Sequence, residues 1–572
     1  MMNNEQKDPY NVTDIVPPFD ITCNIKNLML PTRDNIKLHT IVYFPPVHPP
    51  KCSVVLVRSP YTRTTYFGLP YEEALKHQAI YIQQACRGTG WSEGTFDPAQ
   101  RDNEKNDAED LFAWLTKQDW FNGRCAMFGA SYPGWCQWSA QRAQFSGLVA
   151  TTPRVAPMHS CVGAATDGGG VQLSFGINWM LSMHHRSTYG YEGVPDYNAM
   201  KTVWKLPVID SDKHAGYSAL APFRHFFESA NKPSIVLNSY QNEFKTFRAP
   251  ALIAGGWFDN FKPETIESFL LMKKEAATKE ARQFTRLHIG PWGHGGLLNP
   301  ELFGKHCNQD ALNEKQKKYI FNLLKNPTDD PLPNQPAVEF YMLGENCWHT
   351  ADTWPPEKTI IKQAYIHSNG NANSSNGDGT INDTPPSQET PDVYISDPEN
   401  PILSNHGQHQ ALGCYDRSDQ EQRSSMLVFT SEKFTTPRTV TGEVQFEFFA
   451  SVSTPDTDFF ATLAEVTPEG HSYGLTTGMI RARFRNSMTS EELLIPGEIY
   501  KFKINLSHIA VKFLPGHALR LEIHGQNFPN LDRNANTGGP ILQDEKLRLS
   551  RHTIYHSDKY PAFLSLPINN SF

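Results

Sequence analysis

Residues 124–134, RCAMFGASYPG, decide the fold class of this chain. The apolar run 124–128 predicts a short strand, and Gly129-Ala130-Ser131-Tyr132-Pro133-Gly134 leads into a helical pattern. Glycines two residues before and three after Ser131 permit a sharp turn that presents the hydroxyl above the C-terminal edge of a sheet. The spacing departs from Gly-x-Ser-x-Gly because Pro133 stands where the second glycine is expected. Ser131 is a candidate nucleophile, although Gly-x-Ser turns are also common in ordinary loops.

Strands alternate with helices on both sides of this turn. The strand-like runs lie at 24–30, 37–44, 53–57, 79–83, 251–254 and 286–289. Residues 107–117 carry the apolar spacing of an amphipathic helix. Such alternation indicates a parallel α/β sheet. The sequence therefore predicts an α/β-hydrolase domain that is discontinuous, formed by 1–150 and 246–355.

Two further regions depart from the α/β pattern. Residues 151–245 are irregular and aromatic, which predicts a helical cap inserted into the hydrolase domain. After about residue 355 the helical patterns end, and many short strand candidates separated by turns predict an all-β jelly roll over 356–572. Within it, the polar tract 368–390 predicts a mobile loop, because its Asn, Ser and Gly residues cannot bury a core.

Length, charge and cysteine pattern narrow the class of protein. A chain of 572 residues exceeds the roughly 250–300 residues of a single core. The net charge of −8, without a Lys/Arg-rich run, argues against a nucleic-acid partner. A polar N-terminus and the lack of a long apolar run argue against a secretion signal, a membrane span or a membrane partner. Nine scattered cysteines indicate free thiols and a cytoplasmic location.

A serine nucleophile needs a base, and the base needs a carboxylate that orients it. Asp259 follows the strand candidate 251–254, and His294 follows 286–289, so both lie on loops after strands. Their order, serine, then acid, then histidine, is that of α/β-hydrolases. Taken singly, Asp259 also suits a turn or helix cap, and His294 a surface loop. The ordered triple favours the catalytic interpretation.

The motifs now resemble a known family. The chain is similar to the CocE/NonD hydrolases, the cocaine esterase and glutaryl acylase group, which are relatives of Xaa-Pro dipeptidyl-peptidases and α-amino acid ester hydrolases. The resemblance covers nearly the whole chain. Its markers are Arg58-Ser59-Pro60-Tyr61, Arg87-Gly88-Thr89-Gly90-Trp91-Ser92-Glu93-Gly94, Gly129-Ala130-Ser131-Tyr132-Pro133-Gly134, Gly255-Gly256-Trp257-Phe258-Asp259, Gly290-Pro291-Trp292-Gly293-His294, Pro455-Asp456-Thr457-Asp458-Phe459, Asn527-Phe528-Pro529 and Asn534-Ala535-Asn536-Thr537-Gly538.

The resemblance implies roles for individual residues. The catalytic triad carries over onto Ser131, Asp259 and His294, and the oxyanion hole onto the Tyr61 hydroxyl and the Tyr132 backbone N–H. It also implies a hydrolase domain split by a helical cap and followed by a jelly roll. We interpret the glycine-rich segment 87–94 as a structural turn tied down by arginine, without a phosphate role.

Neither a cofactor nor a metal is expected from the sequence. His184-His185 and the His406 and His409 pair lack the partner ligands and spacing of a zinc site, so we interpret them as loop histidines. The two-step acyl transfer expected of Ser131 needs only protein groups.

The expected partner is a small-molecule ester or amide. Phe261 and Trp135 are candidate pocket residues, and aromatic walls favour apolar acyl groups. Family members that bind a substrate ammonium place carboxylates just after the catalytic acid, whereas this chain has Asn260, Phe261 and Lys262 there. This departure favours an esterase. Xaa-Pro dipeptidyl-peptidase and β-lactam-type acylase activities, an inactive binding protein that uses the jelly roll, and a homodimer stay open.

Overall fold

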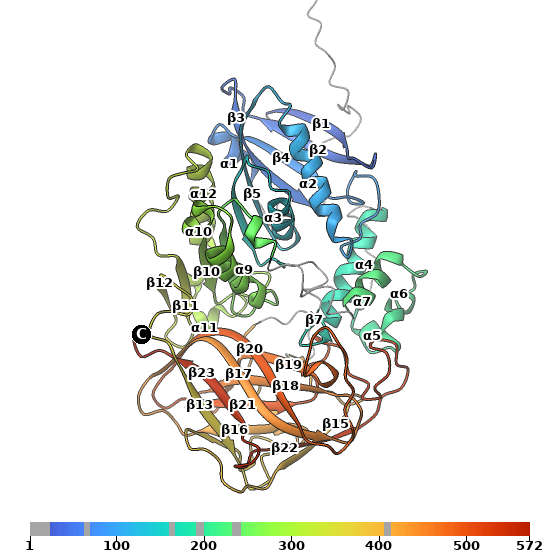
Figure 1. Ribbon diagram of the computed structural model, residues 1–572, viewed down its shortest axis with the longest axis vertical. Helices are drawn as coiled ribbons and strands as arrows, with labels where there is room; N and C mark the ends of the chain where they lie inside the picture. Colours follow the sequence, from blue (N-terminus) through green and yellow to red (C-terminus); the bar gives the residue numbers. More distant parts are fainter. Residues whose placement is uncertain (1–22, 62–68, 159–165, 190–198, 231–241, 405–412) are drawn as a thin grey trace, which may run out of the picture.

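The computed structural model describes residues 23–61, 69–158, 166–189, 199–230, 242–404 and 413–572. Figure 1 shows an α/β domain at the top, a group of helices at one side and a β-sandwich below. The chain enters the α/β domain, leaves it for the helical insertion, returns to it and then ends in the β-sandwich.

The α/β domain is built on one ten-stranded sheet with the order β1-β2-β4-β3-β5-β6-β9-β10-β11-β12. Neighbours from β4 through β11 pair in parallel, whereas β1, β2 and β12 pair antiparallel at the edges. The strands are Asn24–Pro31, Lys37–Phe44, Cys52–Ser59, Ile80–Ala85, Phe121–Ala130, Leu148–Arg154, Leu252–Gly256, Arg286–Gly290, Val338–Met342 and Cys347–Ala351 for β1 to β6 and β9 to β12. The predicted α/β class is confirmed.

Helices cover both faces of this sheet. In β3, Val54 and Leu56 face the core shared with α2 and α3, while Val55 and Val57 face the core shared with α1 and α12. This alternation makes the strand apolar throughout, as expected of a doubly covered parallel sheet. The helices are α1 Tyr71–Lys76, α2 Arg101–Leu115, α3 Tyr132–Arg142, α9 Lys262–Glu275, α10 Lys279–Phe284, α11 Pro300–Phe303 and α12 Asp310–Lys325.

Strand β5 begins earlier than its sequence suggests. Asn122-Gly123 reads as a turn, yet Phe121 already pairs with Cys52 of β3. The register shifts between the Cys52 and Val54 pairs, and Gly123 has a φ of 88°. The glycine therefore supplies a bulge inside the strand rather than a connection before it.

The inserted cap packs on the helix that follows Ser131. It contains α4 Leu173–Tyr189, α5 Ala199–Val203, α6 Ser211–His214 and α7 Ala221–Ala230, with a short β7 Thr166–Asp167 and β8 Gly170–Val171 pair. The spacing of Phe223, Phe226 and Phe227 places them on one buried face of α7. They share a core with Tyr132 and Trp135 of α3. Because β6 still belongs to the sheet, the insertion begins after residue 154 rather than at the predicted boundary of 150.

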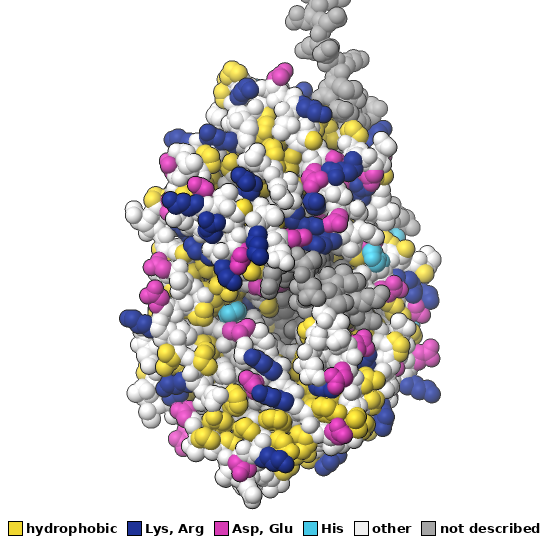
Figure 2. Space-filling view, in the orientation of Figure 1, with side chains coloured by type: hydrophobic (Ala, Val, Ile, Leu, Met, Phe, Trp, Pro, Cys, Tyr) yellow, Lys and Arg dark blue, Asp and Glu magenta, His cyan; other side chains and the backbone are white. Residues whose placement is uncertain are grey.

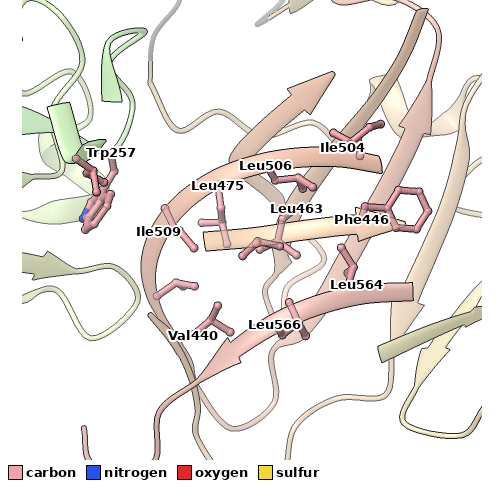
Figure 3. Packing of buried hydrophobic residues seen from close by; sticks show 14 of the residues in the cluster. Trp257, Val440, Phe446, Leu463, Leu475, Ile504, Leu506, Ile509, Leu564 and Leu566 are labelled. Atoms are coloured by element: carbon pink, nitrogen blue, oxygen red, sulfur yellow. The ribbon is translucent and has the colours of Figure 1, made fainter. Parts of the chain in front are cut away.

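The C-terminal part is a β-sandwich whose strands are almost all antiparallel. Its strands are β13 Ile360–His367, β14 Thr380–Asn382, β15 Asp392–Ser396, β16 Leu427–Ser431, β17 Arg438–Val452, β18 Asp458–Val466, β19 Ser472–Arg481, β20 Tyr500–Phe513, β21 Ala518–His524, β22 Ser550–Tyr555 and β23 Phe563–Ile568. Figure 3 shows aliphatic side chains from β17, β18, β19, β20 and β23 packed together, with Trp257 of the α/β domain lying beside this core.

The prediction of a mobile loop at 368–390 is wrong. This tract contains β14, which pairs with β13 and with β16. Ala372 and Ile381 are buried, and the Asn373 side chain donates to the carbonyl oxygens of Val393 and Ser424 at 2.9 Å each. The polar residues of the tract are therefore satisfied by specific partners, which composition alone does not reveal.

A network of buried ion pairs in the β-sandwich is hydrogen-bonded to the cap. Asp456 and Asp458, which belong to one of the motifs that carry the family resemblance, pair with Arg483 and Arg481 at 2.8 Å each. Arg481 also contacts Asp532, which accepts a hydrogen bond from the Val171 backbone N–H. The carboxylates therefore contribute to an interdomain network.

Basic and acidic side chains are interspersed on the face seen in Figure 2, and apolar side chains gather at its lower end, over the β-sandwich. Large apolar residues exposed on β13 include Ile360 and Ile361. Within the described residues, every helix is too short or too polar to cross a membrane.

Candidate active site

Ser131 lies on a strained turn between β5 and α3. Its φ is 60° and its ψ is −128°, a backbone conformation that costs a non-glycine residue about 1–3 kcal/mol. Its N–H donates to the carbonyl oxygen of Arg154 on β6 at 2.9 Å. The turn is thereby fixed to the neighbouring strand, and 8% of the residue remains exposed.

The positions of the two glycines have a steric reason. Gly129 has a φ of 148°, and a Cβ there would lie 2.5 Å from the Cβ of Pro133. A Cβ on Gly134 would lie 2.5 Å from the Cβ of Ala156. The second close approach therefore falls at residue 134 and not at 133, which explains the unusual glycine spacing.

The structure brings Ser131, His294 and Asp259 together. His294 Nε2 lies 3.0 Å from Ser131 Oγ, and His294 Nδ1 lies 2.8 Å from Asp259 Oδ2. The second oxygen of Asp259 accepts the backbone N–H of Phe261 at 2.7 Å. Asp259 is buried, while 19% of the His294 side chain is exposed. A buried carboxylate therefore fixes the ring orientation, and the opposite nitrogen faces the serine.

The loops that carry the acid and the histidine are bonded to each other. The N–H of Trp257 donates to Gly290 at 2.9 Å, and that of Phe258 donates to Trp292 at 3.0 Å. A Cβ on Gly256 would lie 2.0 Å from the Trp292 carbonyl oxygen, so only glycine permits this approach. Because β9 and β10 are parallel neighbours, the two loops leave the same edge of the sheet.

Tyr61 follows β3 and contacts the cap. Its hydroxyl oxygen accepts a hydrogen bond from Trp179 Nε1 of α4 at 3.3 Å. The Trp179 ring lies 5.9 Å from the Tyr132 ring and 5.8 Å from the Phe96 ring. The aromatic composition of residues 151–245 predicted a cap, but no sequence pattern indicated that Trp179 would contact Tyr61.

Tyr132 is the first residue of α3, and the N–H groups in the first turn of a helix point out of its N-terminal end. Its side chain is held below the sheet edge, because the hydroxyl donates to Glu104 Oε1 at 2.9 Å. Glu104 is paired with the buried Arg58 at 2.9 Å. Burial acts to lower the pKa of Arg58, but the charge of Glu104 raises it, so the guanidinium stays charged. No motif in the sequence pointed to Glu104.

The two candidate pocket residues differ in position. The Phe261 ring stands edge-on to the His294 ring, with centroids 5.3 Å apart, and it also contacts the Phe175 ring of the cap. Trp135 is 1% exposed and packs against the Tyr132 ring, with centroids 4.9 Å apart. Phe261 therefore borders the histidine, whereas Trp135 supports Tyr132 from the core.

The structure also describes some of the other residues discussed in the sequence, namely those of the turn at 87–94 and of the histidine pairs. Arg87 pairs with Asp34 and with Asp107 at 2.7 and 2.6 Å, as expected for a structural turn at 87–94. The His184 ring stands edge-on to Tyr217, with centroids 5.6 Å apart. The side chain of His185 and both residues of the His406 and His409 pair lie outside the described residues.

Two family models match separate parts of the chain. Residues 34–296 match the X-Pro dipeptidyl-peptidase (S15 family), and residues 333–565 match the X-Pro dipeptidyl-peptidase C-terminal non-catalytic domain. The first range contains Ser131, Asp259 and His294, and the second contains the β-sandwich. The two models follow the division seen in the fold.

Curated relatives match over most of the chain. Cocaine esterase of Rhodococcus sp. (strain MB1 Bresler) is 29% identical over 581 residues, covering 95% of this chain and 98% of the relative. A putative serine esterase of Mycobacterium bovis is 26% identical over 524 residues, covering 78% of each chain.

Solved structures share the whole architecture. An α-amino acid ester hydrolase superposes with a TM-score of 0.80 at 21% identity, covering 97% of this chain and 98% of its own. A CocE/NonD family hydrolase from Staphylococcus aureus superposes with a TM-score of 0.68 at 17% identity, covering 96% and 97%. At these identities the likeness shows the fold alone. The two family models and the full-length relatives together show that this chain is a serine hydrolase, similar to cocaine esterase and to the X-Pro dipeptidyl-peptidases of the S15 family.

Proposed function

We propose that this protein cleaves carboxylic esters of small acyl substrates through an acyl-enzyme on Ser131. One observation carries the proposal: Ser131 Oγ and Asp259 Oδ2 lie on opposite nitrogens of the His294 ring, at 3.0 and 2.8 Å. One nitrogen can therefore accept the serine proton while the other donates to the carboxylate.

The reaction proceeds in two acyl transfers. Ser131 Oγ attacks the substrate carbonyl carbon, and His294 Nε2 takes the hydroxyl proton and passes it to the leaving alkoxide. The ester C–O bond breaks, and the acyl group stays on Ser131. Water then gives a proton to His294 and attacks the acyl-enzyme, which releases the carboxylic acid and restores the serine. Asp259 stabilises the imidazolium in both steps.

Tyr61 and the Tyr132 backbone N–H are the proposed oxyanion donors. Trp179 donates to the Tyr61 oxygen, so this bond occupies a lone pair of the oxygen rather than the hydroxyl proton. Tyr132 stands at the N-terminus of α3, where an N–H points away from the helix toward developing negative charge. Loss of one such donor typically lowers the rate about 10²–10³-fold.

Groups beside the acid favour neutral acyl groups. Asn260 donates to Gln172 at 3.1 Å, and the Lys262 ammonium, which is buried, donates to Thr476 at 2.9 Å. None of the three residues that follow Asp259 is a carboxylate that could pair with a substrate ammonium. This supports simple esters over amino-acid esters, and cocaine esterase is the full-length relative in line with it. The S15 match keeps Xaa-Pro amides as the alternative substrate class.

A cytoplasmic location and a small-molecule partner belong to the same proposal. The cysteines of the described residues are free thiols, which supports a reducing compartment. A homodimer stays a prediction.

The test is a substrate panel of p-nitrophenyl esters, p-nitroanilides and Xaa-Pro amides. We expect kcat/KM to be highest for an ester with an apolar acyl group, and expect Ser131→Ala to lower it for every substrate. Ser139→Ala is a matched control, because Ser139 lies on α3 with a buried side chain. Faster cleavage of Xaa-Pro amides than of any ester would contradict the ester assignment.

A further inference from the structure

A second group of reactive side chains lies at the far edge of the hydrolase sheet. Glu345 stands in the turn between β11 and β12, and Cys347 and His349 follow on β12. Because side chains two apart on a strand point to the same face, Cys347 and His349 project together beside Glu345. One ligand atom from each of the three lies within 4.8 Å of the other two.

The three groups converge on one point. His349 Nε2 lies 2.8 Å from Glu345 Oε2 and 3.3 Å from Cys347 Sγ. A nucleophile, base and acid in series would use both ring nitrogens, as His294 does. Here the sulfur and the carboxylate oxygen share the same nitrogen, which can accept or donate only one proton at a time. This geometry suits three ligands around one cation better than a proton relay.

The backbone that presents these side chains is rigid. Gly344 has a φ of 79°, and a Cβ there would lie 2.2 Å from the Lys512 carbonyl oxygen. Leu343 exchanges backbone hydrogen bonds with β20, accepting from the Lys512 N–H at 2.9 Å and donating to Ala510 at 3.0 Å. Asn346 Nδ2 donates to the Leu302 carbonyl oxygen at 2.8 Å. The turn is therefore preorganised between the hydrolase sheet and the β-sandwich.

A second layer of contacts orients the ligands. Lys512 Nζ donates to Glu345 Oε1 at 2.8 Å, so the other oxygen, Oε2, faces His349. The Phe340 and Phe572 rings flank the imidazole, with centroids 5.8 and 5.1 Å from its own. The side chains of His349 and Glu345 are 22% and 31% exposed, which leaves an entry path from solvent.

We propose that Glu345 Oε2, Cys347 Sγ and His349 Nε2 bind one Zn²⁺ ion, with a fourth position open to water. Sulfur, imidazole and carboxylate are the ligands of tetrahedral zinc, and three protein ligands leave an exchangeable site. On binding, the Cys347 thiol releases its proton to solvent, so thiolate and carboxylate together balance the charge of the ion. No redox step is involved. The ion clamps the edge hairpin of the hydrolase domain, and Lys512 connects it to the β-sandwich.

A second cluster, which contains two thiols and a carboxylate, differs from the proposed site in its burial. Cys86, Glu104 and Cys136 are fully buried, with the two sulfurs 3.8 Å apart. Glu104 already pairs with Arg58 and accepts the Tyr132 hydroxyl. Because all three of its side chains are buried and its carboxylate already has two partners, this cluster serves as an internal comparison.

The test uses the full chain after treatment with a chelator and dialysis. We expect one Zn²⁺ per chain in a competition titration with a chromophoric chelator, and a sulfur-to-cobalt charge-transfer band when Co²⁺ is added instead. Cys347→Ser abolishes that band, and His349→Ala lowers zinc affinity by at least about 100-fold. Cys23→Ser is the matched control, because Cys23 is the other half-buried cysteine of the described residues. It keeps both signals.

Measurements of ester hydrolysis and of melting temperature separate zinc binding at this site from effects on catalysis or on folding. Wild type and His349→Ala keep the same kcat for p-nitrophenyl acetate, and Zn²⁺ raises the melting temperature of wild type alone. His349→Gln replaces His349→Ala if the alanine variant fails to fold. Absence of zinc binding in wild type would overturn the proposal, as would an unchanged Co²⁺ band in Cys347→Ser.

Discussion

Among the described residues, His294 and His556 each lie within hydrogen-bond distance of both a serine hydroxyl and a carboxylate, and the two groups differ in the partners of the imidazole. At the candidate active site, His294 faces Ser131 with one nitrogen and Asp259 with the other. In the β-sandwich, His556 Nδ1 lies 2.9 Å from Glu389, and its Nε2 lies 2.9 Å from Asp392 and 3.2 Å from the Ser368 hydroxyl.

His556 cannot act as a base for Ser368, because a carboxylate lies beside each of its two ring nitrogens. With acids on both nitrogens, the His556 ring is held as an imidazolium that donates twice. Burial acts to lower the pKa of His556, but the hydrogen bonds and charges of Asp392 and Glu389 outweigh it and raise the pKa. The Ser368 hydroxyl donates to Asp392 at 2.6 Å instead. This group is an ion-paired clamp and has no proton acceptor for its serine.

Backbone and exposure separate the two groups further. Ser131 has a φ of 60° on a strand-to-helix turn, and 19% of the His294 side chain is exposed. The His556 side chain has no exposed surface. A serine, a histidine and an acid within bonding distance therefore do not define a hydrolase site. The site also needs a neutral nitrogen, a presented hydroxyl and access for substrate.

The largest expected effect comes from replacing the histidine of each group by alanine and comparing the two variants. His294→Ala removes the base, and we expect kcat for p-nitrophenyl acetate to fall by about 10⁴–10⁶-fold. His556→Ala leaves kcat within a few-fold of wild type in protein that remains folded. Steady-state kinetics on matched preparations measure both. Equal loss of activity in the two variants would contradict the assignment of roles.

A smaller effect on kcat is expected from the proposed oxyanion donor of the candidate active site. Tyr61→Phe removes only a hydroxyl, and we expect kcat to fall by about 10²–10³-fold because one oxyanion donor is lost. KM should change little, since the ground-state carbonyl bears less charge than the tetrahedral intermediate. Trp179→Phe, which removes the N–H that bonds the Tyr61 hydroxyl oxygen together with the five-membered ring of the indole, should have a weaker effect. A Tyr61→Phe variant with wild-type kcat would remove the tyrosine from the mechanism.

The third expected effect is on stability and concerns the clamp. His556→Ala leaves Asp392 and Glu389 without their buried partner, which costs about 3–5 kcal/mol of unfolding free energy. Because the folded pKa of His556 is raised, its contribution is complete below its unfolded pKa near 6.5 and is lost as pH rises through the folded value. Urea titrations between pH 5 and 9 should show the difference between wild type and variant shrinking at high pH. A difference that grows with pH would reverse the assigned charge state.

The same contrast shows what the sequence can and cannot predict. Ser131, Asp259 and His294 each follow a short strand at a glycine-containing turn, so local patterns and chain order located them. Ser368 and Glu389 lie within or beside a polar tract whose composition predicted mobility. They are held by His556, which lies 188 and 167 residues away in the chain. Long-range partners of polar residues leave no local periodic signal.

Other contacts that the sequence did not predict also join residues far apart in the chain. The contact of Trp179 with Tyr61 and the bond from Tyr132 to Glu104 join segments that only the folded sheet brings together. The Glu345, Cys347 and His349 group is local in sequence, but its significance depends on the turn that β20 fixes. Sequence patterns predicted the helices, the strands and the reactive residues, but not the contacts between distant segments that hold those residues in place.

The most direct test of the central claim is labelling with a fluorophosphonate probe, followed by peptide mapping. We predict that the probe modifies Ser131 in the wild-type protein, that labelling is lost in Ser131→Ala, and that it persists in Ser368→Ala. Modification of Ser368, labelling that remains in Ser131→Ala, or folded wild-type protein that fails to react would contradict the account.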